Sequence, residues 1–142
     1  MQMILKERLQ AYIIENNPDL MLLLQVDFSV TRYLEDKVAR VMPTVMRLLE
    51  EQRPGYIIQE LALKEMTAEL RPSRYNYLLE LLEAEFEADY LRFEKAGVLT
   101  YELINMIAHC KGVFEDFKFS EAQLQDRFLR YAMLARMHDY LN

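Results

Sequence analysis

Glycine and proline are scarce in this sequence, and most of them lie where a helix would begin or end. The chain has three glycines and four prolines among 142 residues. Sandwiches and barrels need a turn about every ten residues, and turns use glycine and proline, so this scarcity disfavours a β-rich architecture. Hydrophobic residues make up 52% of the chain and charged residues 28%, as in a globular protein with a core to bury. We therefore expect an all-α fold.

Seven amphipathic segments follow from the apolar spacing and from the residues that begin or end helices. Asn17 and Pro18 mark one restart, because Asn favours the N-cap position and Pro the first helical position. Gly97 is expected to close a helix in the left-handed conformation, and Ser120 with Gln123 forms a capping box. The predicted helices cover residues 2–15, 18–25, 29–52, 56–70, 74–95, 101–111 and 121–141.

Pro43 lies inside the predicted helix 29–52. It removes a backbone donor and clashes with the carbonyl group of residue 39, so we expect a kink or a break there. The predicted connections are only a few residues long, and the sequence shows no internal repeat and no linker. We therefore predict a single multihelical domain over residues 1–142, orthogonal or bundle-like, with about six to seven helices.

The helix predicted at 74–95 is the longest uninterrupted one, and apolar residues occupy two of its sides. A surface helix buries one face, so we expect this helix either to be central in the fold or to contact a second chain, as in a symmetric dimer. The first face contains Tyr75, Leu78, Leu79, Leu82, Phe86, Tyr90 and Phe93. The nearly opposite face, the candidate interaction face, contains Tyr77, Leu81, Ala84, Ala88 and Leu91.

An acidic strip runs between these two faces. It consists of Glu80, Glu83, Glu87 and Glu94. A strip of this kind is usually a solvated face, and a surface for a metal or a protein partner is the alternative.

The charge balance argues against a broad nucleic-acid surface, because phosphate binding needs a basic field and the net charge is −6. The C-terminal segment has a modest basic character, but its arginines form no single stripe on a helix. These candidate basic residues are Lys118, Arg127, Arg130 and Arg136. Binding of nucleic acid is therefore the less favoured function.

No arrangement of residues typical of catalysis is visible. Three isolated glycines cannot form a phosphate-binding loop or a nucleophile elbow, and one Cys with two His cannot form a standard zinc site. No Asp or Glu stands three residues before a His, as a di-metal site in a helical bundle requires. Cys110 is expected to be a buried apolar residue that points away from its neighbour His109. We predict no catalytic, cofactor-binding or metal-binding residue.

The chain is expected to be cytoplasmic, without a targeting or membrane segment. Its longest apolar run, Leu20 to Leu24, is five residues long, whereas a membrane span needs about 20. Charged residues near the N-terminus lie where a signal peptide has its apolar run. A single cysteine fits a reducing compartment.

Several short patterns between residues 9 and 86 are similar to those of a known family. Its clearest motif is Ser73-x-Tyr75, followed by apolar residues and Glu85-Phe86, although Pro72 stands where the family tends to have an aromatic residue. The chain resembles a family of small uncharacterised all-helical bacterial proteins, a domain of unknown function associated with mobile elements of anaerobic bacteria. The resemblance implies a helical fold and no catalytic residue. Its other matching positions are Leu9, Tyr12, Ile13, Glu15, Pro18, Asp19, Phe28, Arg32, Glu60, Leu61, Ala62, Leu70, Leu78, Leu79 and Leu82.

Three functions stay open at this point. The first is a non-enzymatic helical module that binds a protein partner or a second copy of itself. The second is an accessory protein of a mobile element that associates with nucleic acid. The third is a small-ligand binder or an enzyme with a pocket between helices.

Overall fold

The computed structural model describes residues 1–142 and contains no strand. Helices include 82% of the residues, so the all-α prediction is confirmed. There are nine α-helices, more than the six to seven predicted. The chain divides into two compact units, Met1–Arg71 and Pro72–Asn142, and each unit has its own hydrophobic core. The assignment of residues 1–142 to one domain stays a prediction.

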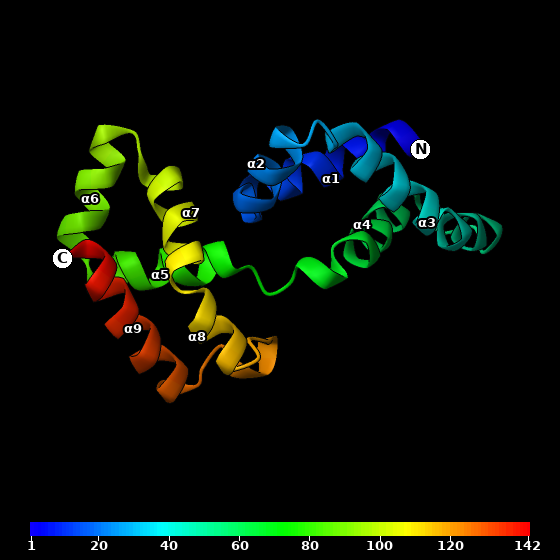
Figure 1. The fold of residues 1–142 in the computed structure, drawn as a ribbon. Coiled ribbons are helices and arrows are strands. Elements are labelled where there is room, and N and C mark those ends of the chain that lie inside the picture. Colours follow the sequence, from blue (N-terminus) through cyan, green and yellow to red (C-terminus); the bar gives the residue numbers. More distant parts are fainter. The chain divides into compact units, whose positions relative to one another are not determined.

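The first unit is built from four α-helices and one 3-10 turn (Figure 1). Apolar residues four positions apart face its core, as at Leu5 and Leu9 of the first helix and at Val41 and Val45 of the third. Each of these four side chains is at most 1% exposed. The elements are α1 (Gln2–Asn16), α2 (Pro18–Val26), α3 (Val30–Glu50), α4 (Gly55–Met66) and η1 (Ala68–Leu70).

Pro43 does not break α3, which runs without interruption from Val30 to Glu50. Of the two predicted outcomes the break is therefore wrong, and the kink stays a prediction. Val41 and Val45 on either side of the proline are buried in the core. Their packing holds the helical path through a position that lacks one backbone hydrogen bond.

The second unit contains five α-helices and a second 3-10 turn. Its core includes Leu78 and Leu82 of α5 together with Leu103 of α7 and Met133 of α9, none of which is exposed to solvent. The elements are α5 (Arg74–Glu85), α6 (Glu87–Ala96), α7 (Leu99–His109), α8 (Lys111–Asp116), η2 (Glu121–Gln123) and α9 (Arg127–Leu141).

The single helix predicted at 74–95 is two helices in the structure. Phe86 leaves the helical conformation, with φ −134° and ψ 51°, and separates α5 from α6. A straight helix over 74–95 would be about 33 Å long, too long for both ends to reach one small core. The break lets Phe93 of α6 join the same core as Leu78 of α5.

The last predicted helix starts six residues later than expected, at Arg127 instead of residue 121. Ser120 makes no capping hydrogen bond from its side chain. Asp126 caps α9 instead, since its carboxylate accepts a hydrogen bond of 2.9 Å from the backbone N–H of Phe128. The predicted boundary at Gly97 is confirmed, because that residue has a φ of 74° after α6.

The predicted helix 101–111 ends next to Gly112, but in the structure Gly112 lies inside the following helix, α8. The helix predicted at 101–111 is α7, which begins and ends two residues earlier. None of the helices combines the length and the apolar character that crossing a lipid bilayer requires.

Candidate interaction surface

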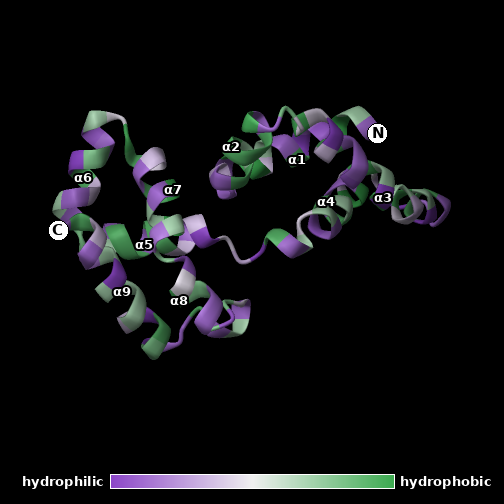
Figure 2. Ribbon diagram, in the orientation of Figure 1, coloured by the Kyte–Doolittle hydropathy of each residue, from purple (hydrophilic) through white to green (hydrophobic).

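Four apolar side chains are exposed at the end of α2 and in the turn that follows it. They are Leu22, Leu23, Val26 and Phe28, with exposed fractions of 37%, 58%, 65% and 95%. We call these four residues the α2 surface. The opposite side of the helix is buried through Met21 and Leu24, so α2 is apolar on both sides (Figure 2). A helix of this composition normally has both sides covered.

Phe28 has an unfavourable backbone conformation as well as an exposed ring. Its φ of 55° lies in the left-handed region, which a bulky residue adopts at a cost of about 1–3 kcal/mol. The turn is closed by a 2.9 Å hydrogen bond from the N–H of Ser29 to the carbonyl oxygen of Leu24. Glycine is the usual residue at this place after a helix. An aromatic side chain held here in solvent makes this turn a candidate for a role in binding.

The α2 surface was not identified from the sequence. The run from Leu20 to Leu24 was visible there, but hydrophobicity alone predicts burial. Which side of a helix with apolar residues on both sides stays uncovered depends on how the other helices of the unit pack.

The candidate interaction face predicted on 74–95 does not form one continuous apolar surface. Tyr77 and Leu81 are buried in the core of the second unit, whereas Ala84, Ala88 and Leu91 are exposed. The ring of Tyr77 packs edge-on against Phe119, with centroids 5.1 Å apart. The break at Phe86 further places Ala88 and Leu91 on a different helix from Ala84.

The residues of the predicted acidic strip are all exposed. Glu80 and Glu83 lie on α5, and Glu87 and Glu94 lie on α6 after the break. Glu94 accepts a hydrogen bond of 2.9 Å from the hydroxyl group of Tyr90. No group of three or more His, Cys, Asp or Glu side chains is placed to hold a metal ion.

The candidate basic residues make separate contacts within the second unit. Arg130 pairs with Glu85, and Arg136 donates a hydrogen bond of 3.0 Å to the carbonyl oxygen of His109. Arg127 lies over the ring of Phe128, and Lys118 is exposed in a turn. Two of the four cations are therefore already engaged by oxygen atoms of the same chain.

Cys110 is buried, as predicted, with no exposed area. Burial raises the pKa of its thiol from 9.0 to about 11, and the charge of Arg136 offsets a smaller part of that rise. The thiol therefore carries no charge at neutral pH, and a thiolate is the form that acts as a nucleophile.

Pockets lie between helices within each unit, and one of them, of about 390 Å³, is lined by Glu80, Glu83 and Ala84 of α5 and by Arg130 of α9. Another, of about 410 Å³, is lined by Arg92, Phe93, Glu102, Tyr140 and Leu141. In it the hydroxyl group of Tyr140 donates a 2.5 Å hydrogen bond to Glu102. Burial, followed by this hydrogen bond, raises the pKa of Tyr140 to about 12, so the hydroxyl stays protonated at neutral pH. Tyr140 is thus a hydrogen-bond donor and not a base.

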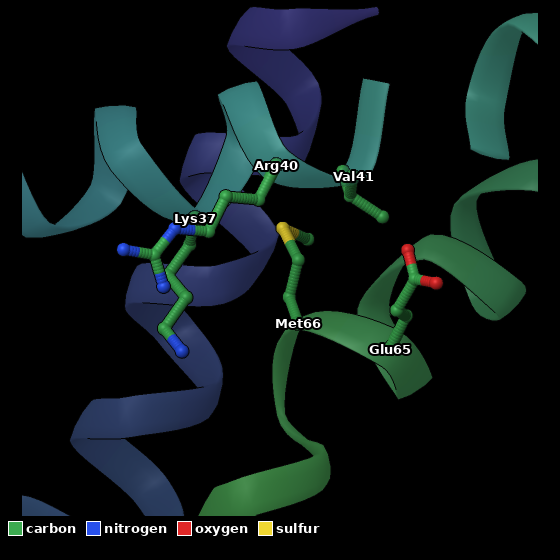
Figure 3. Close-up of a pocket in the computed structure, with 5 residues that line it drawn as sticks. All are labelled: Lys37, Arg40, Val41, Glu65 and Met66. Carbon is green, nitrogen blue, oxygen red and sulfur yellow. The ribbon is translucent and has the colours of Figure 1, made fainter. Parts of the chain in front are cut away.

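A smaller pocket, of about 150 Å³, lies between α3 and α4 (Figure 3). Lys37, Arg40 and Val41 come from α3, and Glu65 and Met66 come from α4. In Figure 3 the two cationic side chains extend to one side of Met66, and Glu65 lies on the other side.

Comparisons with family models, with curated proteins and with solved structures found no match to this chain. The resemblance over residues 9–86 therefore stays a prediction from the sequence.

Proposed function

We propose that this chain is a non-enzymatic helical interaction module, and that it binds a second copy of itself through the α2 surface. The observation that carries this proposal is the exposure of four neighbouring apolar side chains, one of them the strained Phe28. Exposed apolar groups that cluster on a soluble protein are typical of binding sites.

Charge favours a second copy as the occupant of the α2 surface. In a symmetric dimer the same patch faces itself, so charged groups of one sign in the patch would repel each other. The chain has a net charge of −6, but the segment from Leu22 to Phe28 carries a single charged side chain, the exposed Asp27. Two acidic copies can therefore meet here with only one acidic side chain from each copy at close range.

The size of the α2 surface sets the expected strength of association. Stable interfaces use about 20–30 residues on each side, and the α2 surface supplies four anchors. We therefore expect a reversible dimer with a dissociation constant in roughly the micromolar range or weaker.

Sedimentation velocity over a concentration series tests this proposal. We expect the wild type to shift from monomer to dimer as its concentration rises, and the double variant Leu23→Glu, Val26→Glu to stay monomeric. Tyr101→Glu is the matched control, because Tyr101 is also an exposed apolar residue, at 64%, but lies outside the α2 surface. A wild type that is monomeric up to about 1 mM, or a dimer that the double variant leaves intact, would overturn the proposal.

A further inference from the structure

The pocket between α3 and α4 places two cations on one wall. Lys37 and Arg40 are three residues apart on α3 and therefore lie on the same side of the helix. Like charges at this spacing repel each other by about 0.2–0.5 kcal/mol in an isolated helix. From this arrangement we infer that the pocket is a binding site for a small oxyanion, a carboxylate or a single phosphate group, held between Lys37 and Arg40.

Hydrogen-bond donors remain available at both cations. Lys37 forms an ion pair with Glu69, which uses one of the three N–H groups of its ammonium. The exposed Arg40 makes no ion pair and no hydrogen bond within the chain, so its five N–H donors are free. A planar guanidinium group can bind two oxygen atoms of a carboxylate or phosphate at once.

The surroundings of Lys37 strengthen an interaction with an anion. The Lys37 side chain is only 13% exposed, and the buried residues Val41 and Met66 form the apolar part of the pocket. Burial first, and then the charge of Arg40, lowers the pKa of Lys37. A bound anion would oppose both effects, because it favours the charged form of the lysine.

Glu65 limits the kind of anion that fits. It lines the pocket on the side of Met66 opposite the cations (Figure 3), and it accepts a hydrogen bond of 3.2 Å from the hydroxyl group of Thr44. With Glu69 it balances the two positive charges overall, so net attraction is left only for an anion small enough to lie directly against Lys37 and Arg40, on the side of Met66 away from Glu65. A volume of about 150 Å³ has room for one carboxylate or phosphate group.

An NMR titration of backbone amides at constant ionic strength tests the site. We expect inorganic phosphate or acetate to shift the amides of Val41, Glu65 and Met66 in a saturable manner. Comparing the two anions identifies the preferred ligand, because the anion that binds more tightly shows whether the pocket favours a phosphate or a carboxylate group. Shifts that do not saturate with either anion, or that sodium chloride reproduces, would overturn the inference.

Variants of α3 show whether the cations carry the binding. Arg40→Gln should weaken the affinity by about tenfold and Lys37→Gln by a similar factor. Arg47→Gln is the matched control, because Arg47 is an exposed arginine of the same helix that pairs with Glu51 outside the pocket. Equal affinity in the wild type and in Arg40→Gln would show that the anion binds elsewhere. Arg40 is exposed, so its variant is expected to fold.

Discussion

The Nη2 atom of Arg130 lies 2.6 Å from Oε1 of Glu85 and joins the first turn of α9 to the last residue of α5. Each charge stands at the unfavourable end of its own helix. An acidic residue at a helix C-terminus and a basic residue at an N-terminus both oppose the helix dipole. Their pairing offsets two unfavourable local interactions, which explains how α9 can hold Arg130 in its first turn.

This pairing predicts a small, salt-dependent coupling between Arg130 and Glu85. The two side chains retain 41% and 45% exposure, so solvent screens their attraction. A double-mutant cycle with Arg130→Ala and Glu85→Ala should give a coupling of about 0.2–1 kcal/mol in urea unfolding at low salt. The coupling should shrink at about 1 M salt. The control is a second cycle that combines Glu85→Ala with Arg127→Ala. Arg127 makes no ion pair, so the coupling energy in this cycle should be near zero.

Replacing Phe28 by glycine should affect stability and association in opposite directions. Glycine accepts the left-handed conformation without strain, so the free energy of unfolding of the dilute protein should rise by up to about 1 kcal/mol. The same change removes the most exposed apolar side chain of the α2 surface, so dimerisation should weaken. Urea unfolding and sedimentation velocity measure the two effects.

Gln52→Gly provides the control for this pair of measurements. Gln52 also has a left-handed backbone, with a φ of 58°, but its side chain is polar. We expect it to raise stability in the same way and to leave association unchanged. If both glycine variants weakened the dimer equally, the role assigned to the Phe28 side chain would be wrong.

Sequence patterns predicted the all-α class and two helix boundaries that depend on local chemistry. Pro18 begins α2 and Gly97 ends α6, because each residue type favours that position without help from the rest of the chain. The break at Phe86 had no such signal, since phenylalanine is ordinarily accepted in a helix. The break depends on tertiary packing, because it allows Phe93 of α6 to reach the core of the second unit.

The same distinction explains why the candidate surface differs from the predicted one. The pattern on 74–95 predicted two apolar sides, but the structure buries only Tyr77 and Leu81 of the second side, and the break at Phe86 divides that side between two helices. Hydrophobicity could not show that α2 keeps one apolar side exposed. The division into two units with separate cores could not be predicted from the sequence either. Pro72 indicates a helix boundary, and that signal is the same whether or not a new unit begins there.

Pro43→Ala should stabilise the first unit. α3 continues through Pro43, which lacks the N–H group needed for a helical hydrogen bond. Alanine restores that bond and should raise the free energy of unfolding by about 1–3 kcal/mol, measured by urea unfolding followed by circular dichroism. Met46→Ala, at an exposed position of the same helix, should change it by less than about 0.5 kcal/mol. Loss of stability in Pro43→Ala would instead show that the proline shapes α3 for packing.

Cys110 should make stability fall at alkaline pH. The pKa of its thiol is about 11 in the folded chain against 9.0 when unperturbed, so the folded state keeps a proton that the unfolded state releases. The stabilisation is complete below pH 9 and is lost progressively as the pH rises towards 11. A difference of this size corresponds to about 2–3 kcal/mol. Urea unfolding between pH 8 and pH 11 measures the loss.

Comparison with Cys110→Ala separates the effect of thiol ionisation on stability from that of the tyrosines and lysines, which also titrate in this pH range. The variant should be less stable than the wild type at pH 8, because it leaves a small cavity in the core. Its stability should nevertheless fall less steeply above pH 9, so the two curves should converge near pH 11. Parallel curves would mean that the thiol ionises as easily in the folded chain as in the unfolded one. Alkylation by iodoacetamide provides an independent readout, because a buried neutral thiol should react far more slowly in the native protein than in urea.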